Sequence, residues 1–74
     1  MVIEIATLAR PAFLCLPRDI RRAISAKAQD VAQGKTQGAV NHGGGIFSFE
    51  ASGGIVVYVS VELGTKVTIE HIIE

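Results

Sequence analysis

The side chains best suited to catalysis or metal binding are few and far apart in this sequence. It contains one cysteine, Cys15, and two histidines, His42 and His71. A zinc site needs several thiolates or imidazoles at set spacings, and these residues do not provide them. We therefore expect no metal site, and no motif indicates a cofactor.

The same residues also give little indication of acid–base or nucleophilic catalysis. Cys15 lies between Leu14 and Leu16, which predicts a small buried side chain rather than an activated thiolate. His42 lies in a glycine-rich segment and is predicted to be exposed, where it could contact a ligand; a general acid or base role is the weaker interpretation. His71 is predicted to lie on the inward side of a strand. No serine lies in a nucleophile motif, so the sequence favours binding over catalysis.

Basic side chains cluster at Arg18, Arg21 and Arg22. On a helix, residues 18 and 22 share a face and residue 21 is offset from them, which predicts a small basic patch. Such a patch could contact phosphate or an acidic segment of a partner. The alternative is a solvated helix face, balanced by Asp19 and by glutamates elsewhere in the chain.

Aromatic side chains that could stack on a base or a partner are scarce. Phe47 and Phe49 are predicted to face the core, which leaves Tyr58 as the aromatic residue available for binding. The candidate binding residues are therefore Arg18, Arg21, Arg22, His42 and Tyr58.

Two glycine motifs are similar to nucleotide-binding loops but lack residues that such loops require. The segment 34–36, Gly-Lys-Thr, has Gln29 where a phosphate loop needs its earlier glycine, and it follows a helix instead of opening one. The triple glycine at residues 43–45 has Ser48 at the third glycine position of a dinucleotide fingerprint. We interpret the triple glycine as a sharp turn or a close approach to a neighbouring backbone.

The length and composition predict one folded domain over residues 1–74, with 49% apolar and 19% charged residues. A chain this short with no internal disulfide is expected to gain stability from a protein partner or a second copy. The zero net charge excludes nucleic-acid binding by overall field. Charge is nevertheless segregated: residues 10–35 hold six basic and two acidic residues, a local +4, and residues 36–74 have a local charge of −3.

The start of the chain lacks the pattern of a secretory leader. Its longest strongly apolar run, residues 55–59, is far below the roughly 20 residues that a membrane helix needs. We therefore expect a cytoplasmic protein without membrane contact.

Apolar spacing predicts the elements that position these residues. Residues 2–5 form a β-branched strand, and residues 7–16 contain at most one or two helical turns, with Phe13, Leu14 and Leu16 turned inward. Apolar residues at three- and four-residue steps predict an amphipathic helix over residues 17–33, with Pro17 at its first position.

Alternating residues predict strands over the second half of the chain. Residues 34–45 are expected to be a loop, and residues 46–51, 55–62 and 65–73 to be strands. Turns are expected at residues 52–54 and 63–64. On the last strand, Val67, Ile69, His71 and Ile73 are predicted to face inward. The expected fold is α+β: a strand, a short helical segment, and one main amphipathic helix packed on a small antiparallel sheet with a three-stranded meander.

This order of elements resembles the RelE/ParE toxin superfamily of bacterial toxin–antitoxin systems. The resemblance lies in LPRDIRRAISAKAQDVAQG, from Leu16 onward, and in GGGIFSFEASGGIVVYVSVELGTKVTIEHI. It rests on pattern and hydrophobic register and covers roughly three quarters of the chain.

The resemblance does not extend to the residues of RNA cleavage. Family members that cleave messenger RNA on the ribosome carry arginines and lysines on the second and third strands of the fold, and a basic tail after the last strand. This sequence has Ser48, Glu50 and Ile55 at the strand positions, and it ends at Glu74, where that tail would begin. The resemblance therefore implies a shortened member without the cations that hold and stabilise phosphate, and no catalytic residue is carried over.

Three functions follow from the sequence. The first is a RelE/ParE-like protein-binding module without nuclease activity, docking through a sheet edge or the groove between helix and sheet. The second is an active toxin, a ribosome-dependent ribonuclease or a gyrase inhibitor, in which Arg18, Arg21 and Arg22 make the contacts. The third is a self-associating structural protein that pairs through its apolar last strand as a homodimer. We favour the first.

Overall fold

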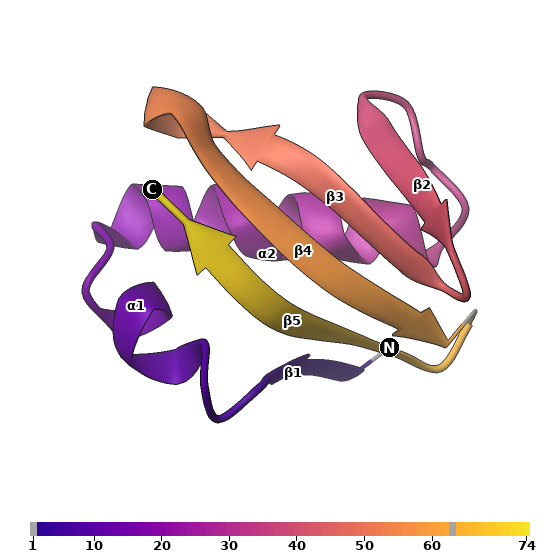
Figure 1. Cartoon of the computed structure of the whole chain (residues 1–74), viewed down its shortest axis with the longest axis horizontal. Coiled ribbons are helices and arrows are strands. Elements are labelled where there is room, and N and C mark those ends of the chain that lie inside the picture. Colours follow the sequence, from indigo (N-terminus) through magenta and orange to yellow (C-terminus); the bar gives the residue numbers. More distant parts are fainter. Residues whose placement is uncertain (1, 63) are drawn as a thin grey trace.

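Residues 2–62 and 64–74 are described by the computed structural model, and within them the chain forms two α-helices and five β-strands (Figure 1). In chain order the elements are β1 (Val2–Ile5), α1 (Arg10–Leu14), α2 (Arg18–Ala32), β2 (Ala39–Gly43), β3 (Ile46–Ala51), a 3-10 turn (Ser52–Gly54), β4 (Ile55–Glu62) and β5 (Lys66–Ile73). The α+β class is confirmed. Of the turn expected at residues 63–64, Leu63 lies outside the described residues.

The strands form a sheet in the order β1-β5-β4-β3-β2. Strands β2 to β5 pair antiparallel, which confirms the meander predicted over β3, β4 and β5. The predicted sheet was too small and too uniform, because β1 pairs parallel with β5 and β2 adds a strand at the other edge. The sheet is therefore mixed rather than antiparallel throughout.

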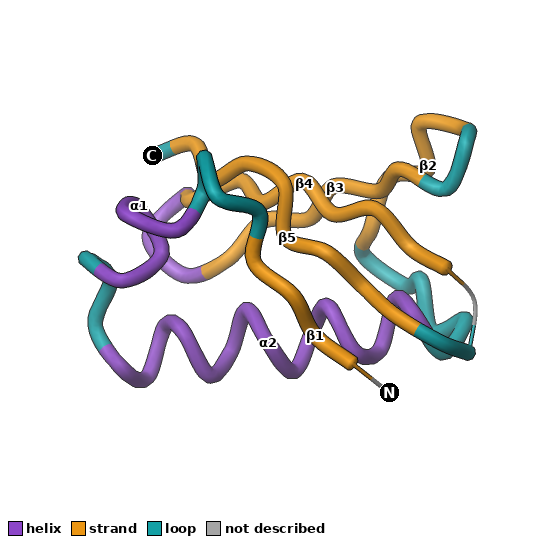
Figure 2. Tube along the Cα trace, turned by 90° about the horizontal axis from the view of Figure 1, so that it is seen from below, coloured by secondary structure: helices purple, strands orange, loops and turns teal. Residues whose placement is uncertain are grey.

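The main helix α2 lies across one side of the sheet, as Figure 2 shows. Pro17 has an extended backbone and occupies the N-cap position, one residue before the helical position expected for it, and it makes no side-chain capping bond. Asp19 lies in the first turn, where its carboxylate interacts favourably with the positive end of the helix dipole. The helix ends just before Gly34, whose φ of +88° suits the left-handed turn that follows.

Apolar residues of α2 and of the sheet face it covers form the core. Ile24 and Val31 of the helix are fully buried, as are four side chains of the sheet: Val57, Val59, Val67 and Ile69. The inward orientation of Phe49 is also confirmed, and Phe47 packs against the core with part of its surface exposed. Burial of this face is the main source of stability for a chain of this size.

The predicted packing of the short helix α1 is confirmed for some of its residues and wrong for others. Phe13 and Leu16 are buried in the core, but Leu14 is 58% exposed and Cys15 is also exposed. The predictions of an inward Leu14 and a buried Cys15 were therefore wrong. A single helical turn presents one side to the core, and residues 14 and 15 follow Phe13 around to the solvent side.

The end of β5 differs from its predicted alternation. Tyr58 pairs with His71 and Val59 with Ile69, so Glu70 is an additional residue in the ladder, a β-bulge. Beyond the bulge, the odd-numbered residues of β5 no longer face the core and the even-numbered ones do. His71 and Ile73 are exposed and Ile72 packs against the core, which corrects the prediction that His71 and Ile73 face inward.

Strand β2 replaces part of the loop predicted for residues 34–45. It pairs with β3 from Ala39 opposite Phe49 to Gly43 opposite Ile46. Its sequence, Ala-Val-Asn-His-Gly, has low β propensity, and the pairing depends on contact with β3 rather than on local preference. Within the described residues, no helix is long and apolar enough to cross a membrane.

Candidate functional site

The side of the sheet turned away from α2 carries the most concentrated group of interacting polar and aromatic side chains. Val57 and Val59 face the core, so Tyr58 between them points to the opposite, open face. The rings of Tyr58 and His42 lie 5.5 Å apart between centroids and are tilted by 31°. His42 Nε2 and Ser48 Oγ share a hydrogen bond of 2.7 Å. These contacts bring together residues from β2, β3 and β4.

The hairpin between β2 and β3 places His42 over its neighbours. The register shifts between Asn41 and Gly43, so His42 is the additional residue of a bulge. Asn41 Oδ1 accepts a hydrogen bond of 2.8 Å from the Gly43 amide and holds this turn. Gly45 has a φ of +81° and approaches β4 closely, where its carbonyl accepts a bond of 2.8 Å from the Val61 amide. The predicted role of the triple glycine is confirmed at Gly45.

Several partly exposed apolar residues lie on the same face as Tyr58. Ser48 and His71 lie opposite Tyr58 on the two neighbouring strands, Val40 lies opposite Ser48, and Val56 pairs with Ile73. Val40 is 57% exposed and Ile73 is 52% exposed. We call this group the open-face patch; it consists of Val40, His42, Val56, Tyr58, His71 and Ile73.

Polar side chains, several of them acidic, occupy another part of the open face. Glu70 Oε2 accepts a hydrogen bond of 2.7 Å from Ser60, and Lys66 Nζ lies 3.7 Å from Glu4 Oε1. Ser60, Glu62, Lys66 and Glu70 contribute to a polar hollow of about 370 Å³. Glu70, which precedes His71, and Glu50, which lies opposite Val56, border the open-face patch.

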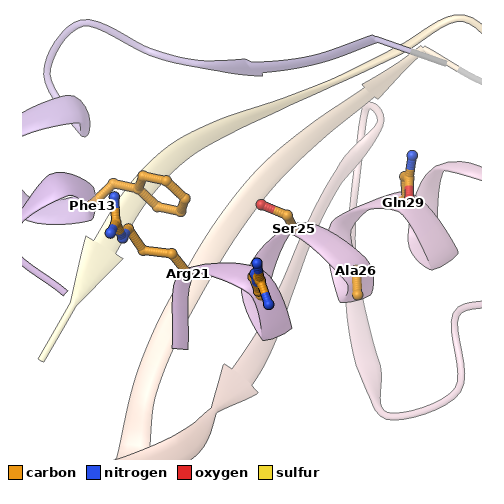
Figure 3. Close-up of a pocket in the computed structure, with 6 residues that line it drawn as sticks. Phe13, Arg21, Ser25, Ala26 and Gln29 are labelled. Atoms are coloured by element: carbon orange, nitrogen blue, oxygen red, sulfur yellow. The ribbon is translucent and has the colours of Figure 1, made fainter. Parts of the chain in front are cut away.

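The arginines lie on the other layer of the molecule. Arg21 and Arg22 line an open groove of about 420 Å³ with Phe13 of α1; its remaining residues are Ser25, Ala26 and Gln29 (Figure 3). Arg18 is exposed and does not line this groove. We call the groove lined by Phe13, Arg21 and Arg22 the α1–α2 groove. The predicted binding residues thus divide into His42 with Tyr58 on the open face and Arg21 with Arg22 on the helix layer, while Arg18 stands apart from both groups.

The His42–Ser48 pair has the distance that a base and a nucleophile require, but its surroundings favour a structural role. Ser48 is 7% exposed and lies on the sheet surface beneath its neighbours. Among the described residues, no carboxylate is bonded to His42 in the way that orients the base of a catalytic triad. The bond instead fixes the His42 ring above the sheet, where it contacts Tyr58.

The described part of the chain contains no group of three or more His, Cys, Asp or Glu side chains arranged to hold a metal ion.

Ser48, His71 and Val40 were missed as components of the site. Their positions depend on strand register and on two bulges, which no local spacing in the sequence indicates. Phe13 was also missed as a wall of the α1–α2 groove, because sequence periodicity does not show which elements lie beside a helix.

Comparisons of the chain with protein-family models, with curated proteins and with solved structures give no match. The resemblance to RelE/ParE toxins therefore stays a prediction from the sequence pattern.

Proposed function

We propose that this chain is a small protein-binding module that docks a basic, amphipathic segment of a partner protein on the open face of its sheet. The observation that carries this proposal is the open-face patch. It presents a tyrosine ring and exposed aliphatic side chains on a rigid sheet surface. Tyrosine is among the residues that contribute most to protein interfaces, because its ring gives a large contact area at small entropic cost.

The order within the patch supports binding without prior rearrangement. His42 is held by its bond to Ser48, and its ring in turn contacts Tyr58. Both rings are therefore restricted before a partner arrives, which reduces the entropic cost of binding.

The charges around the patch favour a basic segment. Glu50 pairs across the sheet with Val56, and Glu70 lies in the strand next to Tyr58. Lysine or arginine side chains of a partner would meet these carboxylates while its apolar side chains cover Val56 and Ile73. A second copy that paired through the same face would bring its own glutamates against them, so charge favours a foreign segment over a homodimer formed by two open faces.

The same charges disfavour RNA cleavage on the open face. Phosphate contacts and stabilisation of a cleavage transition state require cations. The open face carries Lys66, which lies 3.7 Å from Glu4 and is partly neutralised by it. Binding of a protein segment is therefore the function that this surface supports better than RNA cleavage.

The proposal is tested by NMR titration of the isotopically labelled chain with two matched peptides. One alternates lysine with leucine and the other alternates glutamate with leucine. We expect saturable shifts of the Val40, Tyr58 and His71 amide signals with the lysine peptide and none with the glutamate peptide.

Two results would overturn this assignment. Shifts of equal size with both peptides would show apolar contact without charge selection. Concentration-dependent broadening of the open-face signals in the absence of peptide would assign the face to a second copy of the chain.

A further inference from the structure

The α1–α2 groove lies on the helix layer, away from the open-face patch, and its lining does not take part in the proposed docking. It is shallow and open: Phe13 gives it an apolar side, and its polar groups come from Arg21, Arg22 and Ser25. Figure 3 shows Arg21 and Ser25 on the side of Phe13, and Ala26 pointing away from it. Cationic side chains beside an apolar ring, on an open surface, can bind a small anion that carries an organic group.

Arg21 has an unmet hydrogen-bonding requirement. Its Nε is buried and has no hydrogen-bond partner among the described residues. A buried donor without an acceptor is unfavourable, and buried polar groups in proteins are nearly always paired. A rotation of the guanidinium toward the groove would bring its fork to an acceptor located there. Figure 3 shows this guanidinium beside Phe13.

Neither Arg21 nor Arg22 forms an ion pair with a carboxylate of the described chain. Both guanidinium groups are therefore available to an external anion. Arg21 and Arg22 line the groove from adjacent positions, which lie about 100° apart around α2. Ser25, four residues after Arg21, adds a hydroxyl donor on the side of Arg21. Guanidinium forks match the oxygens of phosphate in pairs, and a phosphate group has enough oxygens for all three side chains.

We propose that the α1–α2 groove binds a phosphate monoester of a small molecule, with the phosphate held by Arg21, Arg22 and Ser25 and its organic part against Phe13.

Binding is tested on the full chain by titration at constant ionic strength, with phenyl phosphate, inorganic phosphate and benzyl alcohol as probes. Phenyl phosphate combines the anion with an aromatic ring, and the other two probes carry one feature each. We expect phenyl phosphate to bind more tightly than inorganic phosphate by about tenfold, and benzyl alcohol not to bind measurably.

Three arginine variants separate a formed site from general attraction to a basic helix. R21M and R22M remove cations that line the groove, and R18M removes an equal charge from the same helix outside it. We expect R21M and R22M to weaken phenyl phosphate binding about tenfold or more, and R18M to change it less than about threefold.

The wild-type chain gives a second readout that does not depend on how well a variant folds. Phenyl phosphate is expected to shift the Nε–H signal of Arg21 as the guanidinium finds an acceptor, while the Tyr58 amide stays unchanged. Equal weakening by all three variants would overturn the proposal. So would binding of a short single-stranded oligonucleotide with no binding of phenyl phosphate, which would assign the basic helix to nucleic acid.

Discussion

The two faces of the sheet differ in what their apolar residues do. On β4, Val57 and Val59 are fully buried against α2, whereas Val56 and Tyr58, their immediate neighbours, lie partly exposed on the open face. The covered face accounts for the core and for the packing of both helices. The open face retains valine, isoleucine and tyrosine although no described residue covers them. Apolar residues that the fold does not bury are available for a partner.

The loss of stability on mutation is expected to differ most between the two faces when isoleucines of β5 are truncated to alanine. Ile69→Ala removes a fully buried side chain and is expected to cost about 2–5 kcal/mol. A domain of this length has a total stability of about 4–11 kcal/mol, so the variant should be partly unfolded at moderate temperature. The measurement is the free energy of unfolding in urea.

Ile73→Ala is the matched control on the open face of the same strand. Its side chain is 52% exposed, and we expect a loss below about 1 kcal/mol. Equal losses for the two variants would mean that the open face contributes to the core, contrary to the proposed division.

A smaller effect on stability is expected at Gly45, in the turn between β2 and β3. Gly45 has a φ of +81°, and a Cβ atom there would lie 3.0 Å from the Val61 carbonyl oxygen. Gly45→Ala should therefore cost about 2 kcal/mol or more and displace the hairpin that carries His42. Gly44→Ala, at a φ of +63° with open space around it, should cost about 1 kcal/mol.

Thermal unfolding and the shift of the Tyr58 ring signals measure the two consequences of Gly45→Ala separately. Loss of stability with an unchanged Tyr58 environment would show that the hairpin does not set the position of His42.

The sequence predicted the covered face better than the open one. The period of apolar residues identified α2 closely, and alternation identified β1, β3 and β4, because burial on one side leaves a local trace in the order of residues. Strand β2 left no such trace, since Asn41 and Gly43 are poor strand formers. The bulge at Glu70 likewise depends on pairing between strands and reverses the faces of His71 and Ile73.

The candidate site could be predicted residue by residue but not as an arrangement. His42 and Tyr58 were each proposed for binding, whereas their contact follows from the bulge in β2. Arg18 was grouped with Arg21 and Arg22 because all three lie near the start of one helix. Phe13, which comes from another element, makes a groove beside Arg21 and Arg22 and leaves Arg18 outside it.

The hydrogen bond beneath His42 is expected to have a modest effect on stability. Ser48→Ala removes it and should cost about 1 kcal/mol, because His42 is exposed and can bond to water instead. Ser52→Ala, in the exposed turn after β3, is the control and should be neutral. Urea unfolding gives the cost, and a change in the Tyr58 ring signals reports release of the His42 ring. An unchanged ring environment would show that Ser48 does not position His42.

The smallest effect is expected for the charges of the open face. Glu4→Gln removes the ion pair with Lys66, whose side chains are 53% and 35% exposed respectively, and should change stability by less than about 0.5 kcal/mol. The free energy of unfolding at low and high salt measures this contribution. A larger, salt-sensitive loss would mean that these charges maintain the fold.

The most direct test of the open face as a binding surface compares two adjacent residues of β4. Tyr58→Ser is expected to weaken the lysine–leucine peptide about tenfold or more while changing the free energy of unfolding by less than about 1 kcal/mol. Val59→Ser, on the covered face, is expected to destabilise the chain by about 2 kcal/mol or more. The account would be contradicted if Tyr58→Ser left peptide binding unchanged, or if it destabilised the chain as much as Val59→Ser.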